Sequence, residues 1–183
     1  MINPVLMHQG IGLEAFNELP TRRAVHALYE CVNSVTMAAE LAKRRPFTGH
    51  AALFRKADAL LFSLPEQSID EIMAAHPRVG SRPGSPYSHA EQCSLFDTRP
   101  GVMHLLAGAA RRYAEKFGFE FVMHVGGADD ADCSAASVIS AIGDRMHNDS
   151  ETERKVVRNE IAKLNRSRLE RMLGPEGGYD NWI

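Results

Sequence analysis

Apolar residues recur three and four positions apart along most of the chain, and polar residues fill the positions between them. This spacing is typical of amphipathic helices. It predicts a short element at 13–19 and helices over 21–45, 49–64, 69–75, 101–117, from Asp129 or Asp130 to 146, and 150–173. Breakers separate the runs at Pro20, Pro46, Pro65, Gly118 and Gly174. The segment 119–125 alternates in places like an extended strand, but one such segment makes no sheet. The pattern therefore predicts an all-α, single-domain bundle of about seven or eight helices.

Two helix starts carry a local signal. Thr21 is expected to cap the long helix that follows it, whose apolar stripe extends to Val35. Ser150 and Glu153 stand three residues apart, which is the pattern of a capping box at the start of the last helix. The apolar positions of that last helix are Ile161, Leu164 and Leu169.

Size and composition favour one soluble domain. With 183 residues, 44% of them hydrophobic, the chain can bury one sizeable core, so a single domain is expected over residues 1–183. Its core is expected at about 11–173, with a polar tail at 174–183. The 21 basic and 23 acidic residues leave a net charge of −2, so no nucleic-acid partner is expected. The apolar runs are too short to span a bilayer and no targeting segment opens the chain, so we expect no membrane association and a cytoplasmic location.

The cysteines and histidines indicate no metal site. Cys31, Cys93 and Cys133 are an odd number at wide spacing, which argues against a disulfide framework and against a structural zinc site. We expect them to be reduced and packed. The eight histidines are dispersed, without the pairs that bind a metal from one helix face.

The stretch Ala75-His76-Pro77-Arg78-Val79-Gly80 carries the best candidate for acid/base chemistry. Pro77 disfavours the helical conformation for His76, so the preceding helix should end there with the imidazole at its C-terminus. The negative end of the helix dipole favours the imidazolium form, which suits a proton donor. Glu91 follows a Pro/Gly/Ser-rich loop and offers a carboxylate partner. The simpler alternative is that His-Pro only stops a helix and that Ser88-x-x-Glu91 is an ordinary capping box.

Seven short pieces follow one another along the chain. They are Phe16-Asn17-Glu18-Leu19-Pro20, Arg45-Pro46-Phe47, the His76 stretch, Ser88-x-x-Glu91-Gln92, Tyr113-x-x-Lys116-Phe117-Gly118-Phe119-x-Phe121-Val122, Arg145-x-x-Asn148, and Glu160-Ile161-x-Lys163-Leu164-x-x-x-Arg168-Leu169. In this order and spacing they resemble the OHCU decarboxylase family, whose members act on 2-oxo-4-hydroxy-4-carboxy-5-ureidoimidazoline (OHCU) in uric acid degradation. The resemblance covers residues 13–173.

The resemblance implies an all-helical, often dimeric carboxy-lyase that needs neither a metal nor an organic cofactor. Such an enzyme removes the carboxylate of OHCU as carbon dioxide, protonates one face of the resulting carbanion or enediolate and releases (S)-allantoin. His76 resembles the family's catalytic histidine, Glu91 its acidic partner, and Gln92 a nearby polar contact. Arg145 resembles the arginine that meets an oxygen or the carboxylate of the substrate. The further substrate-binding residues that the resemblance implies are Pro77, Ser88, Phe121, Val122, Met123, His124 and Val125, the last five as a segment whose backbone holds the ring.

The residue types suit these roles. A carboxylate beside His76 would fix the tautomer of the imidazole and keep a proton available near neutral pH. The planar guanidinium of Arg145 can hold an anionic oxygen through two parallel hydrogen bonds. Without the resemblance, an exposed ion pair between Arg145 and Asp149, four residues further along a helix, is the simpler interpretation.

The chain departs from the family's usual residues at the pair Thr36-Met37 and at two single positions, Ala110 and His124. Losing an Asn at 110 and gaining an imidazole at 124 would change the polarity of the substrate pocket. A diverged enzyme that acts on another small ureido or imidazoline acid is therefore one alternative. Another is a catalytically silent helical binding module, in which His76 and Glu91 serve only as a helix stop and a cap.

Overall fold

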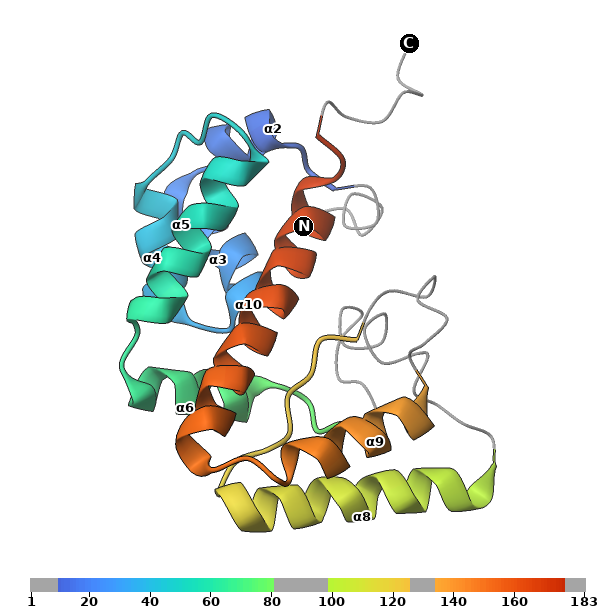
Figure 1. The fold of residues 1–183 in the computed structure, drawn as a ribbon. Coiled ribbons are helices and arrows are strands. Elements are labelled where there is room, and N and C mark those ends of the chain that lie inside the picture. The colour runs from blue at the N-terminus through green and yellow to red at the C-terminus, as the bar shows by residue number, and fades with distance from the viewer. Residues whose placement is uncertain (1–9, 81–98, 126–133, 177–183) are drawn as a thin grey trace. The chain divides into compact units, whose positions relative to one another are not determined.

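A computed structural model describes residues 10–80, 99–125 and 134–176, and within these ranges the chain forms helices and no strand (Figure 1). The helices are α2 (Leu13–Glu18), α3 (Thr21–Val32), α4 (Val35–Lys43), α5 (His50–Ser63), α6 (Glu66–Ala75), α8 (Pro100–Phe117), α9 (Ala135–Arg145) and α10 (Ser150–Leu173). The predicted all-α class is confirmed. None of these helices combines the length and the apolar character that a membrane crossing requires.

Contacts divide the chain into two compact units, each with its own buried core. The first comprises residues 1–68 and 162–183, and the second comprises residues 69–161. The long helix α10 contributes its first half to the second unit and its second half to the first. The expectation of a single domain over residues 1–183 stays a prediction.

The first unit is built on α3, α4 and α5, and the C-terminal half of α10 runs beside α5 (Figure 1). An ion pair between Asp58 and Arg166 joins α5 to α10, with 2.5 Å between Oδ2 and Nη2. Cys31 is buried and is not in a disulfide, as expected, whereas Cys93 and Cys133 lie outside the described residues. The largest fully buried side chains of this core are Phe16, Leu28, Met37, Leu41, Leu53 and Leu61.

Two of the short sequence pieces meet in this unit. The Nη1 atom of Arg45 donates to the carbonyl oxygens of Phe16 (2.9 Å) and Leu19 (2.6 Å). The Asn17 amide accepts from the Phe47 N–H and donates to the Phe47 carbonyl, each at 2.9 Å. Because these bonds satisfy backbone groups in and just after the last turn of α2 and at Phe47, the two pieces have a structural role.

The predicted single helix over 21–45 is wrong, because the chain breaks between α3 and α4. Asn33 adopts the left-handed conformation (φ 51°) and ends α3. Ser34 then caps α4 by accepting a hydrogen bond from the Met37 N–H at 3.2 Å. Val35, predicted on the apolar stripe, is 66% exposed at the start of α4.

The predicted cap at Thr21 is also wrong by one residue. Thr21 is the first residue of α3, and Pro20 holds the capping position without a side-chain hydrogen bond. The Pro20 carbonyl accepts from the Ala24 N–H at 3.0 Å, as the first bond of the helix requires.

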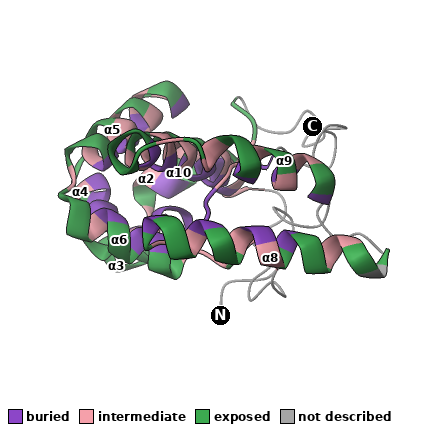
Figure 2. Ribbon diagram, turned by 60° about the horizontal axis from the view of Figure 1, so that its bottom comes forward, coloured by how far each residue is buried: buried purple, intermediate pink, exposed green. Residues whose placement is uncertain are grey.

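The core of the second unit lies between α8 and α9, which pack against each other (Figure 1). Buried positions recur among exposed ones along α8, as the amphipathic pattern requires (Figure 2). Gly118 ends α8 in the left-handed conformation (φ 80°), which confirms the predicted stop. The buried cluster consists of Leu106, Ala109, Tyr113, Phe117, Phe121, Val125, Ala135, Val138 and Ile142.

The start of α9 has its own local signal. Ser134 and Ser137 form a reciprocal capping box, with hydrogen bonds of 3.2 and 2.9 Å to each other's backbone N–H. The predicted start at Asp129 or Asp130 lies outside the described residues. The sequence interpretation overlooked the serine pair because it favoured the acidic residues.

The predicted capping box of Ser150 with Glu153 is wrong. Asp149 caps α10, because its Oδ1 accepts from the Thr152 N–H at 2.8 Å. This cap leaves the Glu153 side chain free to turn inward, where it is fully buried. The predicted end at Leu173 is confirmed, and so is the burial of Ile161, Leu164 and Leu169.

Candidate active site

His76 stands directly after α6, as Pro77 predicts. The His76 N–H donates to the Met73 carbonyl at 3.1 Å, which tightens the last turn of the helix. The Nδ1 atom of the imidazole lies 2.8 Å from the carbonyl oxygen of Ile72. A carbonyl only accepts, so this hydrogen bond requires the proton on Nδ1. A proton exchanged with a ligand would therefore pass through Nε2.

The residues after His76 are held against the rest of the second unit. Arg78 forms an ion pair with Glu120, with 2.9 Å between Nε and Oε1. Gly80 has a φ of 75°, and a Cβ built on it would lie 3.1 Å from Cδ2 of Leu106 on α8. The glycine in this stretch is therefore required by both its backbone conformation and its close approach to α8.

Replacing Gly80 by alanine is expected to lower the free energy of unfolding by about 1–2 kcal/mol, because an L-residue is strained at this φ. Gly143→Ala is the matched control, since Gly143 lies within α9 and its Cβ would meet nothing within 4 Å. That control should gain about 0.4–1 kcal/mol. Urea denaturation measures both, and equal stability of Gly80→Ala and the wild type would contradict the prediction.

Arg145, at the end of α9, lies in a buried polar network. Its Nε donates to Oε1 of Glu153 at 2.7 Å, and its Nη1 donates to the Val122 carbonyl at 2.8 Å. Its Nη2 forms the ion pair with the same carboxylate at 2.5 Å. The side chains of Arg145 and Glu153 are 11% and 0% exposed. The spacing also allowed an ion pair between Arg145 and Asp149. In the structure Arg145 pairs with Glu153 instead, and the Asp149 carboxylate caps α10.

The Glu153 carboxylate collects two further donors. The Tyr113 hydroxyl donates to Oε1 at 2.5 Å, and the Asn148 amide donates to Oε2 at 2.7 Å. Burial, and then the hydrogen bond to this carboxylate, raise the pKa of Tyr113 well above its usual value, so the phenol stays protonated. Lys116 caps the turn between α9 and α10 by donating to the carbonyls of Met146 (2.5 Å) and Asn148 (3.0 Å).

Residues 121–125 form no helix, and they contact this network where Val122 accepts a hydrogen bond from Arg145. Phe121 packs edge-on against Tyr113 with 5.0 Å between the ring centroids, and the Arg145 guanidinium carbon lies 4.4 Å from the Phe121 ring centroid. Phe121, Val122 and Val125 are buried, whereas Met123 and His124 are half-buried. The His124 N–H donates to Oε2 of Glu160 on α10 at 2.7 Å. The side chains of Phe121, Val122 and Val125 thus pack in the core. These three residues can contact a ligand only through their backbone.

The structure describes only some of the residues predicted for the site. His76, Pro77, Arg145 and residues 121–125 all belong to the second unit. Ser88, Glu91 and Gln92 lie outside the described residues, so the predicted pairing of Glu91 with His76 stays a prediction. Of the departing positions, Met37 is buried in the first unit, Ala110 packs against the cluster around Tyr113, and His124 is half-buried.

Sequence reasoning missed the roles of Glu153 and Glu160. The sequence pattern places Glu160 in the last of the seven family-like pieces without indicating a partner, and it predicts Glu153 as part of a helix cap. The available signal was a carboxylate facing the apolar side of α10, next to the buried Val157. Such a carboxylate needs a partner, and Arg145 is the conspicuous cation nearby in the sequence.

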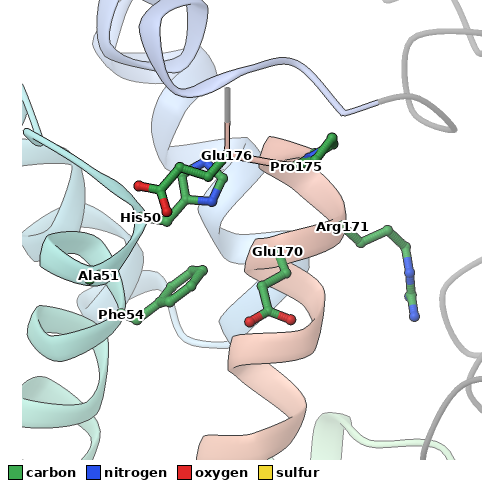
Figure 3. Close-up of a pocket in the computed structure, with 8 residues that line it drawn as sticks. His50, Ala51, Phe54, Glu170, Arg171, Pro175 and Glu176 are labelled. Atoms are coloured by element: carbon green, nitrogen blue, oxygen red, sulfur yellow. The ribbon is translucent and has the colours of Figure 1, made fainter. Parts of the chain in front are cut away.

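Two pockets in the described part of the chain lie away from these residues. One of about 530 Å³ lies in the first unit, where His50 and Phe54 of α5 stand opposite Glu170 of α10 and the Arg171 side chain points away (Figure 3). Another of about 500 Å³ lies between α6 and the end of α8 in the second unit, lined in part by Met73. No predicted site residue lines either pocket, so the candidate site rests on the geometry of His76 and residues 121–125. Among the described side chains, no three His, Cys, Asp or Glu residues are grouped to hold a metal ion.

Known proteins share both the sequence pattern and the fold. The chain is 25% identical over 165 residues to a uric acid degradation bifunctional protein of Bacillus sp. (strain TB-90), and this match covers 88% of the chain but only 32% of that longer protein. The chain thus spans about a third of the length of that curated relative. The structure superposes on an OHCU decarboxylase crystallised in the presence of (S)-allantoin, with a TM-score of 0.67, 20% identity, and coverage of 79% of this chain and 95% of that one.

An (S)-allantoin synthase structure is similar as well, with a TM-score of 0.69, 16% identity, and coverage of 89% of this chain and 54% of that one. At these identities the two structures show that the fold is shared. The sequence profile of the OHCU decarboxylase family matches residues 17–170, which include His76, Arg145 and the 121–125 segment. The chain therefore belongs to the OHCU decarboxylase family.

Proposed function

We propose that this protein decarboxylates OHCU to (S)-allantoin and carbon dioxide in uric acid degradation, without a cofactor. The observation that carries the proposal is the family match over residues 17–170, which spans nearly the whole described chain. The name of the Bacillus relative and the allantoin present with the similar crystal structure support the same chemistry.

In the proposed reaction the bond between the ring carbon and the carboxylate breaks, and carbon dioxide leaves. The electron pair stays on the carbon and is delocalised into the neighbouring unsaturated group. His76, as the imidazolium with a proton on each ring nitrogen, then delivers the Nε2 proton to one face of that carbon, because the Nδ1 proton is committed to the Ile72 carbonyl. The neutral imidazole that remains regains a proton from solvent before the next turnover. Glu91 is proposed to stand near His76 as its acidic partner and to favour the imidazolium form by its negative charge, since Nδ1 is already fixed by the Ile72 carbonyl. Water that reached the other face would give racemic product, so exclusion of water is part of the role of the site.

The remaining predicted residues are proposed to bind the substrate. Pro77, Ser88 and Gln92 follow His76 in the sequence and are proposed to contact the substrate, and the backbone of residues 121–125 is proposed to hold the ring. Arg145 is proposed to neutralise developing negative charge. Its Nε and Nη2 are committed to Glu153 and one Nη1 proton to Val122, so only a small part of the guanidinium remains for an anionic oxygen.

Location and assembly belong to the proposal too. We propose that the protein works in the cytoplasm as a homodimer, with the small-molecule substrate as its partner. The half-buried His124 favours one alternative, a diverged enzyme for another ureido or imidazoline acid, because an imidazole there offers a polar contact that a small residue lacks.

The direct test generates OHCU in situ from urate with urate oxidase and 5-hydroxyisourate hydrolase, and then adds this protein. We expect the ultraviolet absorbance of OHCU to decay faster than it does spontaneously, and circular dichroism to show (S)-allantoin. Decay at the spontaneous rate with racemic product, from a sample whose helical circular dichroism is intact, would contradict the proposal.

A further inference from the structure

We infer that Glu160 is a positioning residue that holds the backbone of residues 121–125 in the geometry needed for the substrate. This inference rests on the proposed function. The carrying observation is the hydrogen bond from the His124 N–H to Oε2 of Glu160, with a donor–acceptor distance of 2.7 Å. A backbone N–H donating to a carboxylate is a charge-assisted bond, roughly twice as strong as a neutral one.

The segment is held at a second point by the same helix. Glu153 stands seven residues before Glu160, so the two carboxylates lie on one face of α10, roughly 10.5 Å apart along its axis. Glu153 acts through Arg145, whose Nη1 donates to the Val122 carbonyl. One face of a long helix thus fixes both Val122 and His124, two residues apart.

Glu153 and Glu160 differ in how much of the structure depends on each of them. Glu153 is fully buried and joins α8, α9 and α10, so its loss would affect the whole unit. Glu160 is half-buried and its bond reaches the segment directly. Without Glu160, the buried Phe121 and Val125 would still fix the segment in the core while the half-buried Met123 and His124 would become looser. The expected consequence is a defect in ligand geometry rather than in folding.

The contact uses the backbone of residue 124 and not its side chain. It therefore does not depend on the imidazole that distinguishes this chain from the usual family pattern. A backbone group that is hydrogen-bonded to the protein is also unavailable to the substrate, so Glu160 decides which groups of the segment can face a ligand.

The test compares Glu160→Ala with Glu160→Gln, because a glutamine oxygen can still accept from the His124 N–H. We expect Glu160→Ala to lower kcat/KM for OHCU by about tenfold and to reduce the optical purity of the allantoin, since small misplacements in a site are costly. Glu160→Gln should recover most of this loss. Amide hydrogen exchange at His124 should be faster in the alanine variant and near the wild-type rate in the glutamine variant.

Glu151→Ala is the matched control, since it removes a carboxylate from the same helix that pairs only with the exposed Lys155 in the described contacts. It should leave kinetics and exchange unchanged. Wild-type kinetics in Glu160→Ala, or equal losses in the alanine and glutamine variants, would overturn the inference while the proposed function stands. Absence of turnover by the wild-type protein would instead overturn the proposed function, and this inference with it.

Discussion

Replacing His76 by alanine is expected to lower kcat for OHCU decarboxylation by roughly 10²–10⁴-fold, the usual contribution of a positioned acid/base group. The allantoin that still forms should be racemic, because protonation would then come from water on either face. The fold should tolerate the change, since His76 is half-buried and lies beyond the last residue of α6. Ultraviolet decay of OHCU and circular dichroism of the product measure both effects.

Two further variants test whether the loss of activity in His76→Ala is due to the loss of Nε2. His76→Asn keeps an N–H that can donate to the Ile72 carbonyl, as Nδ1 does, but has no group in the place of Nε2. It should be as inactive as His76→Ala and closer to the wild type in melting temperature. His104→Ala removes an exposed imidazole from α8 and should keep full activity. Activity retained in both His76 variants would remove this residue from the mechanism.

Replacing Glu153 by alanine is expected to lower the free energy of unfolding by about 3–5 kcal/mol, the usual cost of leaving a buried charge unpaired. The Arg145 guanidinium would lose its ion-pair partner, and the Tyr113 hydroxyl and the Asn148 amide would lose their acceptor. Urea denaturation followed by helical circular dichroism measures the change.

A milder variant keeps the prediction testable if Glu153→Ala does not fold. Glu153→Gln retains an acceptor oxygen of similar shape but loses the charge, so it should lie between the wild type and the alanine variant. Glu151→Ala is again the control, because its ion pair with Lys155 is exposed and should add little stability. Wild-type stability in Glu153→Ala would show that the network does not hold the second unit together.

Much of the fold was predictable because helix ends are set by neighbouring residues. Gly118 and Gly174 supply the left-handed conformation that ends a helix, and both stops are where the sequence predicts them. His76 stands after α6 because Pro77 follows it.

The errors arose where two local signals competed. Asn33 and Ser34 can both lie within a helix, and the apolar spacing on either side favoured a continuous one. In the structure Asn33 ends α3 by adopting the left-handed conformation, and Ser34 caps α4 because its side chain accepts from the Met37 N–H. Ser150 and Glu153 have the spacing of a capping box. In the structure Asp149 caps α10 instead, because its carboxylate accepts from the Thr152 N–H.

The sequence by itself determined the helical class, most helix ends, the position of His76 at a helix terminus and, through its motifs, the family. These follow from interactions within a few residues of one another or from the order of residue types. Only the tertiary structure decided that Arg145 donates hydrogen bonds to the Glu153 carboxylate and the Val122 carbonyl, and that Glu160 accepts one from the His124 N–H. Val122 stands 23 residues from Arg145, and His124 stands 36 residues from Glu160, so these partners meet only when α9, α10 and the 121–125 segment pack together. Burial then makes the Arg145–Glu153 pairing obligatory, because a charge without a partner there is costly, whereas the half-buried bond from His124 to Glu160 only positions the segment.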